Sequence, residues 1–423
     1  MHTRLAAIAL LAPLAVLAAP AEEEAHALSA RVRAELRTSR ALPDLYRLYE
    51  LRDDLTDLGP LARTLDEVAA AKTARSDVRT AALELRAHLA VAQSQLPRAR
   101  EIIARAAPVK AWSVIGPFDN EGRSGLRAVY GPEKDGFVPG AKYAGKEHEV
   151  VWRTLSPELV PMGYVDLSSA IAPSHESTFY ATTVLRSSRA RTAVLHLGAS
   201  GASRVWVNGQ LVREDSAVHP SRWDQIAFAV PLRAGDNTIL LKVAHGAGKP
   251  GFSLRVCDER DEPATSLATS AHVPRAKVAL AAPREAPITL PSARFPDGLA
   301  DLREAARRDP RDARAQEDLA VLLAWRRPYE EGERLALRAQ ERASDAAPGD
   351  AEIELRLARY EDRDANRRRA AIERALSRNP GDAKVLDALA AQRLDHGDAW
   401  GAVRLAQKAR EGSRALQPAL TLA

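Results

Sequence analysis

Arg204-Val205-Trp206-Val207-Asn208-Gly209-Gln210-Leu211-Val212 is the stretch that decides the fold in the middle of this chain. Two apolar runs flank Asn208-Gly209, a dipeptide that favours the positive φ angles of a two-residue hairpin turn. Further short apolar runs, bounded by Gly, Pro and Asp, extend from Val109 to Asp258. Many short strands separated by turns are typical of antiparallel sandwiches. We therefore predict an antiparallel β-sandwich of the jelly-roll type over 109–258.

The sequence on either side of this stretch is helical. From 22 to 107 it is rich in Ala, Leu and Arg, and its apolar residues recur three and four positions apart. Between 259 and 297 six prolines fall among small and polar residues, which predicts an extended linker. The helical pattern returns over 298–423. The expected fold class is multidomain α and β: an N-terminal helical stack, an antiparallel β-sandwich and a C-terminal α-solenoid.

The C-terminal helices contain an internal repeat. Pro310-Arg311-Asp312, Pro348-Gly349-Asp350 and Pro380-Gly381-Asp382 recur after 38 and 32 residues, on either side of the 34-residue period of tetratricopeptide repeats. The chain resembles that family here, most closely in the last repeat. The resemblance implies that small and apolar side chains pack the paired helices together. These positions are Leu319, Ala320, Leu357, Ala358, Leu389, Ala390, Gly397, Ala402 and Ala409.

The sandwich resembles a second family. The runs from Arg204 to Val212 and from Pro231 to Val243 resemble the galactose-binding-like jelly roll, which implies a fold but leaves open whether sugar binds. The whole layout resembles the N-terminal region of exported bacterial transglutaminase-like proteins, whose Cys-His-Asp domain lies further downstream. This chain lacks such a domain. Its apolar segment 415–423 has no polar cap, which leaves open whether the chain is a fragment of a longer protein.

Residues 1–21 are typical of a secretory signal peptide. Arg4 precedes an apolar stretch, and Ala19-Pro20-Ala21 is a small-x-small cleavage pattern in front of Glu22. The apolar stretch is shorter than the roughly 20 residues that span a membrane. We therefore expect cleavage after Ala21, a periplasmic or secreted protein, and no membrane span.

Composition narrows the choice of partners. Hydrophobic residues make up 46% and charged residues 28% of the 423 residues, as in ordinary globular proteins. The net charge is only +5, and no run of five like charges occurs, so we expect no nucleic-acid partner. The repeats imply a protein or peptide partner, and a glycan is a second candidate ligand. The sequence identifies neither the ligand nor the oligomeric state.

No pattern predicts catalysis, a cofactor or a metal site. The run Gly246 to Gly251 matches G-x-G-x-x-G, but a strand pattern follows it, which favours a hairpin loop over a dinucleotide site. Cys257 is the single cysteine, and the adjacent acidic residues would raise the pKa of its thiol, so we expect a structural role. The four histidines of the sandwich lack zinc-ligand spacing. Asp119-Asn120-Glu121 and Asp258-Glu259 could supply oxygen ligands and leave open a calcium site. The histidines are His175, His196, His219 and His245.

The candidate binding edge lies in the sandwich. Arg222-Trp223-Asp224-Gln225 combines charge, an aromatic ring and an amide in an expected loop. Alternation places Trp206 opposite Val205 and Val207, on the face that we expect to be less buried. Such rings can stack on sugars, although core packing explains the same residues. The predicted ligand-binding residues are Trp206, Arg222, Trp223 and Asp224.

Three hypotheses of function follow. The first is an exported, non-catalytic binding or scaffold protein whose repeats contact a protein or peptide, with the sandwich as a second binding module. The second is a carbohydrate-binding protein. The third is the accessory N-terminal part of a transglutaminase-like enzyme.

Overall fold

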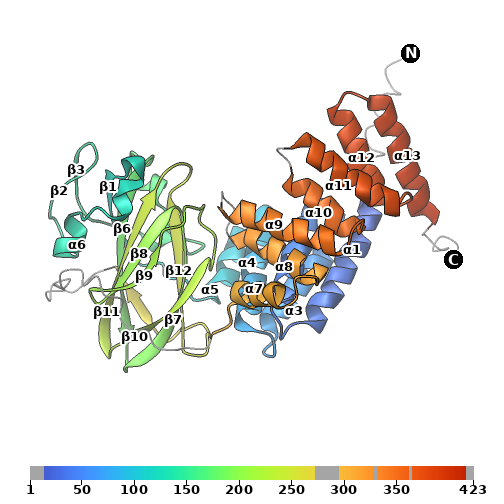
Figure 1. Ribbon diagram of the computed structural model, residues 1–423. Helices are drawn as coiled ribbons and strands as arrows, with labels where there is room; N and C mark the ends of the chain where they lie inside the picture. Colours follow the sequence, from blue (N-terminus) through green and yellow to red (C-terminus); the bar gives the residue numbers. More distant parts are fainter. Residues whose placement is uncertain (1–13, 272–294, 327–330, 362–363, 416–423) are drawn as a thin grey trace, which may run out of the picture. The chain divides into compact units, whose positions relative to one another are not determined.

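The computed structural model describes residues 14–271, 295–326, 331–361 and 364–415. The chain forms two compact units. Among the described residues, a helical unit contains 14–78, 298–325, 331–361 and 364–415, and a sandwich unit contains 79–271 and 295–297 (Figure 1). Arg326 groups with the sandwich unit. The expected N-terminal stack over 22–107 is therefore divided between two units, because its helices pack on different partners.

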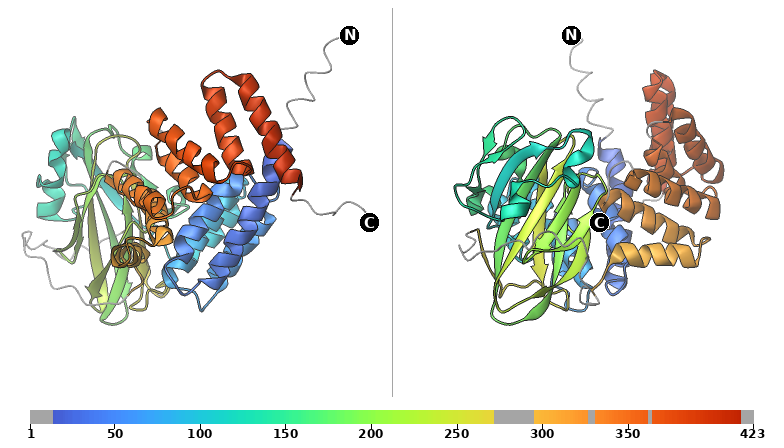
Figure 2. Two further views of the ribbon diagram at one scale, coloured as in Figure 1. Left: turned by 45° about the vertical axis from the view of Figure 1, so that its right-hand side comes forward. Right: turned by 60° about the vertical axis from the view of Figure 1, so that its left-hand side comes forward.

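The helical unit combines the start and the end of the chain. In Figures 1 and 2 the blue α1 lies beside the orange and red helices of the C-terminal repeats. The repeats form a stack of antiparallel helix pairs, as the expected solenoid requires. The helices are α1 (Leu14–Ala34), α2 (Ala41–Glu50), η1 (Leu51–Asp53), α3 (Gly59–Ala70), α7 (Gly298–Arg308), α8 (Ala313–Arg326), α9 (Glu331–Ala346), α10 (Ala351–Tyr360), α11 (Ala365–Arg378), α12 (Ala383–Asp395) and α13 (Ala399–Ala415).

The Pro-x-Asp motifs begin the first helix of each pair. The Asp350 carboxylate accepts a hydrogen bond from the backbone N–H of Ile353 at 3.1 Å, and Asp382 accepts from Lys384 and Val385 at 2.9 and 3.1 Å. These bonds satisfy N–H groups that have no partner inside the helix. The periodic turns that the sequence predicted are confirmed.

Most of the predicted repeat-packing residues are buried, but two differ. Leu389 is only partly buried and packs on the cluster around Leu357 and Ile372. Gly397 is exposed, in the turn between α12 and α13, with a φ of 79°. Gly397 therefore allows the turn instead of packing the helices together, because a left-handed backbone conformation favours a residue without Cβ. The buried members are Leu319, Ala320, Leu357, Ala358, Ala390, Ala402 and Ala409.

A buried ion cluster joins the N-terminal helices to the repeats inside the helical unit. Arg47 of α2 is 5% exposed, and its guanidinium lies 2.7 Å from Asp44, 2.9 Å from Asp318 and 3.0 Å from Glu317. Glu317 also pairs with Arg356 of α10 at 3.2 Å. Arg47 therefore bridges segments 271 positions apart in the sequence.

The sandwich unit contains two large antiparallel sheets with strand orders β4-β1-β6-β11-β8-β9, where β13 also pairs with β6, and β10-β7-β12-β5, and a separate two-stranded sheet of β2 and β3. Its elements are α4 (Ser76–Ala92, of which 79–92 lie in this unit), α5 (Leu96–Ala104), β1 (Ser113–Asp119), η2 (Glu121–Leu126), α6 (Gly131–Asp135), β2 (Tyr143–Ala144), β3 (Glu149–Val150), β4 (Arg153–Thr154), η3 (Pro157–Leu159), β5 (Tyr164–Asp166), η4 (Leu167–Ser169), β6 (Ser177–Ser187), β7 (Arg191–Ala199), β8 (Ala202–Val207), β9 (Gln210–Asp215), β10 (Ile226–Leu232), β11 (Gly235–His245), β12 (Gly251–Cys257) and β13 (Ala268–Ser270).

The hairpin predicted at Asn208-Gly209 is confirmed. Val207 pairs with Gln210 across the turn, and Asn208 and Gly209 have φ angles of 51° and 81°. The other loop prediction is partly wrong, because the strands β11 and β12 that flank Gly246 to Gly251 belong to different sheets. That loop crosses between the sheets and is not a hairpin.

The sandwich also continues beyond its predicted end at Asp258. Cys257 forms a bridge with Pro263, and β13 pairs with β6 through Ala268, Thr269 and Ser270. These residues were expected to begin the linker, but their backbone groups extend the sheet. The remainder of the predicted linker, 272–294, lies outside the described residues, as do 1–13 of the predicted signal peptide and 416–423 of the apolar end.

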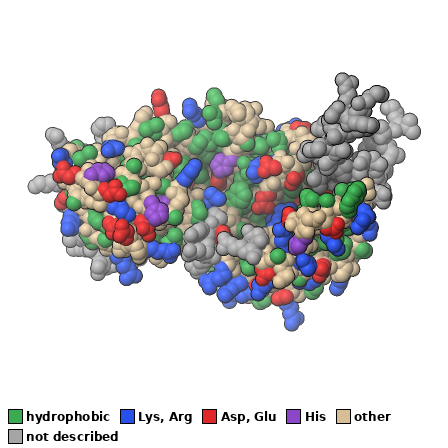
Figure 3. All heavy atoms as spheres, turned by 90° about the horizontal axis from the view of Figure 1, so that it is seen from above, with side chains coloured by type: hydrophobic (Ala, Val, Ile, Leu, Met, Phe, Trp, Pro, Cys, Tyr) green, Lys and Arg blue, Asp and Glu red, His purple; other side chains and the backbone are tan. Residues whose placement is uncertain are grey.

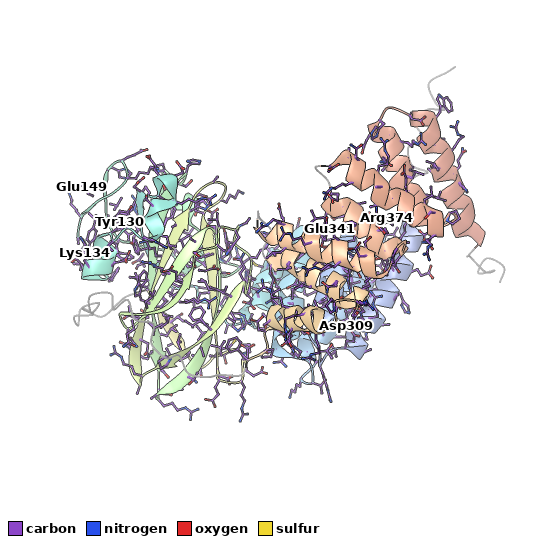
Figure 4. All side chains as sticks on the ribbon, in the orientation of Figure 1. Tyr130, Lys134, Glu149, Asp309, Glu341 and Arg374 are labelled. Atoms are coloured by element: carbon purple, nitrogen blue, oxygen red, sulfur yellow. The ribbon has the colours of Figure 1, made fainter. Side chains whose placement is uncertain are left out.

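The exposure predicted for Trp206 is wrong. Val205 and Val207 do face the core between the sheets, so the alternation itself is confirmed. Trp206 points the other way and is nevertheless 3% exposed, in a second apolar cluster with Trp152 and Tyr180. The segment between β1 and β4, which carries Tyr130, Lys134 and Glu149 in Figure 4, supplies side chains that cover this face.

Candidate functional site

The helical unit contains a cavity of about 480 Å³. Side chains of α10 and α12, the first helices of the last two repeats, line it together with α11, α1 and η1. Binding pockets for small ligands and short segments fall in this size range. We call this cavity the repeat groove, and its apolar lining consists of Leu51, Leu355, Ala358, Ile372, Ala388 and Ala391, together with Ala21, the last residue of the predicted signal peptide.

Charges of both signs surround the apolar lining of the repeat groove. Lys384 pairs with Glu24 of α1 at 2.6 Å, and Arg368 lies 3.6 Å from Asp395. Burial, and then the neighbouring Asp382, raises the pKa of Asp387 to about 6. Acidic and basic side chains also lie among one another on the face of the molecule in Figure 3. The groove therefore offers apolar contacts together with donors and acceptors, without a dominant sign of charge.

The sandwich unit contains a second cavity, of about 370 Å³. Five connecting segments line it, including residues of the loop 246–249. His245 is 3% exposed, its Nε2 lies 3.2 Å from the Gly248 carbonyl, and its Nδ1 has no hydrogen-bond partner among the described residues. Burial lowers the pKa of His245, so the imidazole is neutral at pH 7. Its Nδ1 is therefore a buried polar atom beside the cavity that can still donate or accept one hydrogen bond.

The structure does not bring the four predicted ligand-binding residues together at an open surface. Trp206 is buried on the outer face of the larger sheet, whereas Arg222 to Asp224 precede β10 of the smaller sheet. Arg222 is exposed and Trp223 is half-buried. A sugar-reading pair formed by Trp206 and Trp223 is therefore excluded in this conformation.

Asp224 is an internal ion partner. Its two carboxylate oxygens lie 2.9 and 2.8 Å from Nε of Arg255, whose side chain is buried. Burial by itself would raise the pKa of Asp224, but Arg255 and then His196 hold it down at about 2. The Asp224 carboxylate, which we predicted to contact a ligand, therefore neutralises the buried guanidinium of Arg255 instead.

The structural role expected for Cys257 fits its surroundings. Burial, more than the neighbouring carboxylates, raises the pKa of its thiol to about 12, although Arg255 opposes the shift. The thiol is therefore protonated at neutral pH and is a poor nucleophile.

The acidic residues weighed for calcium already face a cation of the chain. The Lys146 ammonium lies 3.8 Å from Asp119 and 3.7 Å from Glu121. The Asn120 amide is buried and bonds the backbone of His245 and Gly125. Asp258 accepts hydrogen bonds from the N–H groups of its own turn. None of these contacts forms an oxygen cage.

Sequence reasoning missed a buried cluster on the outer face of the smaller sheet. His196, Cys257 and Asp261 place one ligand atom each within 4.8 Å of one another. His196 and Cys257 lie 61 positions apart, so no short spacing motif could reveal them. The signal that was available is the alternation of β7 and β12, which puts both side chains on the face opposite the core.

No family model and no curated protein matches this chain. Among solved structures, a crystal structure of MamA aligns with 28% of this chain and 68% of its own, at 20% identity and a TM-score of 0.25. A β-glucosidase from Kluyveromyces marxianus aligns with 34% of this chain at 12% identity and a TM-score of 0.23. A GH31 α-xylosidase from Xanthomonas citri aligns with 38% of this chain at 18% identity and a TM-score of 0.22. This chain spans only 16% and 17% of those two enzymes, and likenesses this weak carry no argument about function.

The fold and the cavities define the class of this protein: an antiparallel β-sandwich combined with a unit of helical repeats, each unit with its own cavity. None of the helices in the described ranges combines the length and apolarity needed to cross a bilayer.

Proposed function

We propose that this chain is an exported, non-catalytic binding protein that holds a peptide segment of a partner protein in the repeat groove. The observation that carries the proposal is the groove itself, an apolar cavity with charged side chains of both signs around it. The sandwich unit serves as a second module. Export rests on the signal-peptide pattern of residues 1–21.

Two features support a peptide as the occupant. Each helix pair of a solenoid buries its apolar face against its neighbours, and the surface left between pairs is suited to extended segments. The Lys384–Glu24 pair and the half-buried Asp387 offer hydrogen-bond donors and acceptors to a peptide backbone. A peptide with one or two apolar anchors flanked by polar residues matches this chemistry.

The test is binding of a peptide library and of periplasmic proteins to residues 22–423. Ala391 is exposed and lines the groove, so Ala391→Arg fills the cavity without disturbing the core. Ala406→Arg is the matched control, because Ala406 is also exposed and helical but does not line the groove. We expect Ala391→Arg to weaken capture by about tenfold or more, as for loss of an interface hot spot. Equal capture by both variants would reject the groove as the site.

The second cavity favours a small polar ligand of the sandwich, with a glycan as the candidate. Its polar lining includes Asn120, His219 and His245, without an aromatic platform among the residues that line it. A glycan array on the full chain, repeated with His245→Ala, tests this function. Selective glycan binding that disappears in the variant while Ala391→Arg leaves it unchanged would separate the two sites. No observation in the sandwich specifically favours the accessory role in a transglutaminase-like enzyme.

A further inference from the structure

The buried cluster of the sandwich unit is built on two neighbouring strands. His196 of β7 pairs in register with Arg255 of β12, and Cys257 follows two positions later on the same face. The intervening residues Leu195, Leu197 and Val256 point into the core. Asp261 reaches the cluster from the turn after β12, where its backbone N–H bonds the Asp258 carbonyl at 3.0 Å.

The side chains of this cluster are buried and in direct contact. His196 Nε2 lies 2.5 Å from Asp261 Oδ1, and His196 Nδ1 lies 3.7 Å from Asp224 Oδ2. Arg255 Nη1 lies 2.6 Å from Cys257 Sγ. His196 is 4% exposed, and Cys257 and Asp261 are fully covered.

We propose that His196, Cys257 and Asp261 supply three ligands of a binding site for a divalent transition-metal ion of the zinc type. An imidazole nitrogen, a thiolate and a carboxylate are three of the ligand types that Zn²⁺ takes in proteins. The combination of sulfur and nitrogen donors excludes Mg²⁺ and Ca²⁺, which prefer oxygen. Asp224 on the Nδ1 side of the imidazole leaves Nε2 to face the metal, as second-shell carboxylates do in zinc sites.

Charge balance permits a metal ion in this buried place. A dication held by the His196 imidazole, the Cys257 thiolate and the Asp261 carboxylate is neutralised by its two anionic ligands. Arg255 donates to the thiolate, and its own charge remains balanced by Asp224. Metal binding therefore avoids the penalty of burying an uncompensated charge.

Metal entry requires His196 and Asp261 to move apart. Two ligands at about 2.05 Å from a tetrahedral ion lie roughly 3.3 Å apart. His196 Nε2 and Asp261 Oδ1, now 2.5 Å apart, must therefore separate by roughly 0.8 Å. Asp261 lies in a turn, so a shift of this size does not require the strands to part.

The test uses the chelator-treated full chain titrated with Co²⁺, a coloured substitute for Zn²⁺. Because Cys257 is the single cysteine of the chain, a thiolate-to-cobalt charge-transfer band can arise from no other residue. We expect the band to saturate at one Co²⁺ per chain, to disappear when Zn²⁺ is added, and to accompany release of ~1 proton per metal ion from the Cys257 thiol.

Variants separate this site from metal bound elsewhere. Cys257→Ser removes the band, whereas His175→Gln retains it because His175 is exposed and outside the cluster. Should Cys257→Ser fail to fold, the band and the proton count of the unaltered chain still decide. Cobalt bound without a thiolate band, or no proton release with either metal, would show that the cluster is only an internal ion network.

Discussion

The two units bury their charged side chains in different places. In the sandwich unit the core between the sheets is apolar, and the buried ions Lys242–Glu133 and Arg255–Asp224 lie on the outer faces of the sheets. In the helical unit the Arg47 side chain of α2 pairs with Asp318 of α8. The buried ions there lie where an N-terminal helix packs on a helix of the C-terminal repeats. Apolar burial is non-directional, whereas an ion cluster requires particular partners. The comparison suggests that apolar contacts stabilise the sandwich, while charges select which helices meet in the helical unit.

The largest effect is expected in the sandwich core. Trp112 is fully buried, packs edge-on against Phe252 with ring centroids 4.8 Å apart, and donates a hydrogen bond to the Val109 carbonyl at 3.0 Å. Trp112→Ala should lower the free energy of unfolding by about 4 kcal/mol through lost burial and a cavity. Chemical denaturation followed by circular dichroism measures this. Trp400→Ala is the control, because Trp400 is 79% exposed. An equal loss in both variants would refute an apolar origin of stability.

A slightly smaller effect is expected at the ion cluster of the helical unit. Arg47→Ala leaves Asp44 and Asp318 buried without their shared cation, which should cost about 3 kcal/mol. Arg33→Ala breaks the exposed pair with Glu67 and should cost less than about 1 kcal/mol.

The loss in Arg47→Ala should also shrink as the pH falls toward 6, because without Arg47 the buried Asp318 carboxyl takes up a proton at a higher pH. Burial, only partly offset by Arg47, raises the pKa of Asp318 in the unaltered chain to about 6, so below that pH both chains carry the protonated carboxyl and the difference is constant. A loss in Arg47→Ala that did not depend on pH would contradict an electrostatic origin.

An intermediate effect that depends on pH is expected at Glu84 of α4, in the sandwich unit. Burial, and then the charge of Asp224, raises the pKa of Glu84 from 4.5 to about 8. The folded chain therefore holds a proton that the unfolded chain releases between pH 4.5 and 8, so stability falls as the pH rises through this window.

Glu84→Gln removes this dependence. At pH 9 the variant should be more stable than the unaltered chain by on the order of 2 kcal/mol. This free energy is smaller than the pKa difference alone would give, because a buried site relaxes when it ionises. Thermal melts from pH 5 to 9 measure the difference, and the exposed Glu147→Gln is the control. A constant difference between Glu84→Gln and the unaltered chain at every pH would contradict a buried, protonated Glu84.

The smallest effect is expected at a helix cap of the last repeat. Asp382→Ala removes the acceptor for two backbone N–H groups at the start of α12 and should cost about 1 kcal/mol. Asp345→Ala changes an exposed residue of α9 and should cost less than about 0.5 kcal/mol. Hydrogen exchange of the α12 amides detects the change locally, and unchanged protection in Asp382→Ala would show that packing determines this end of the helix.

Local sequence determined the secondary structure of this protein and the positions of its turns. Asn208-Gly209 adopts the positive φ angles of a two-residue turn, and the Pro-x-Asp motifs begin repeat helices, because both effects act within a few residues. Alternation also assigned Val205 and Val207 to one face of a strand and Trp206 to the other.

Only the tertiary structure decided which of these surfaces are covered and which side chains meet. The segment between β1 and β4 buries Trp206, and Arg255 converts Asp224 from a candidate ligand contact into an internal ion. The same long-range packing joins Arg47 to Asp318 and gathers His196, Cys257 and Asp261. Local periodicity records the direction in which a side chain points, but burial and pairing depend on chain segments that arrive from far away in the sequence.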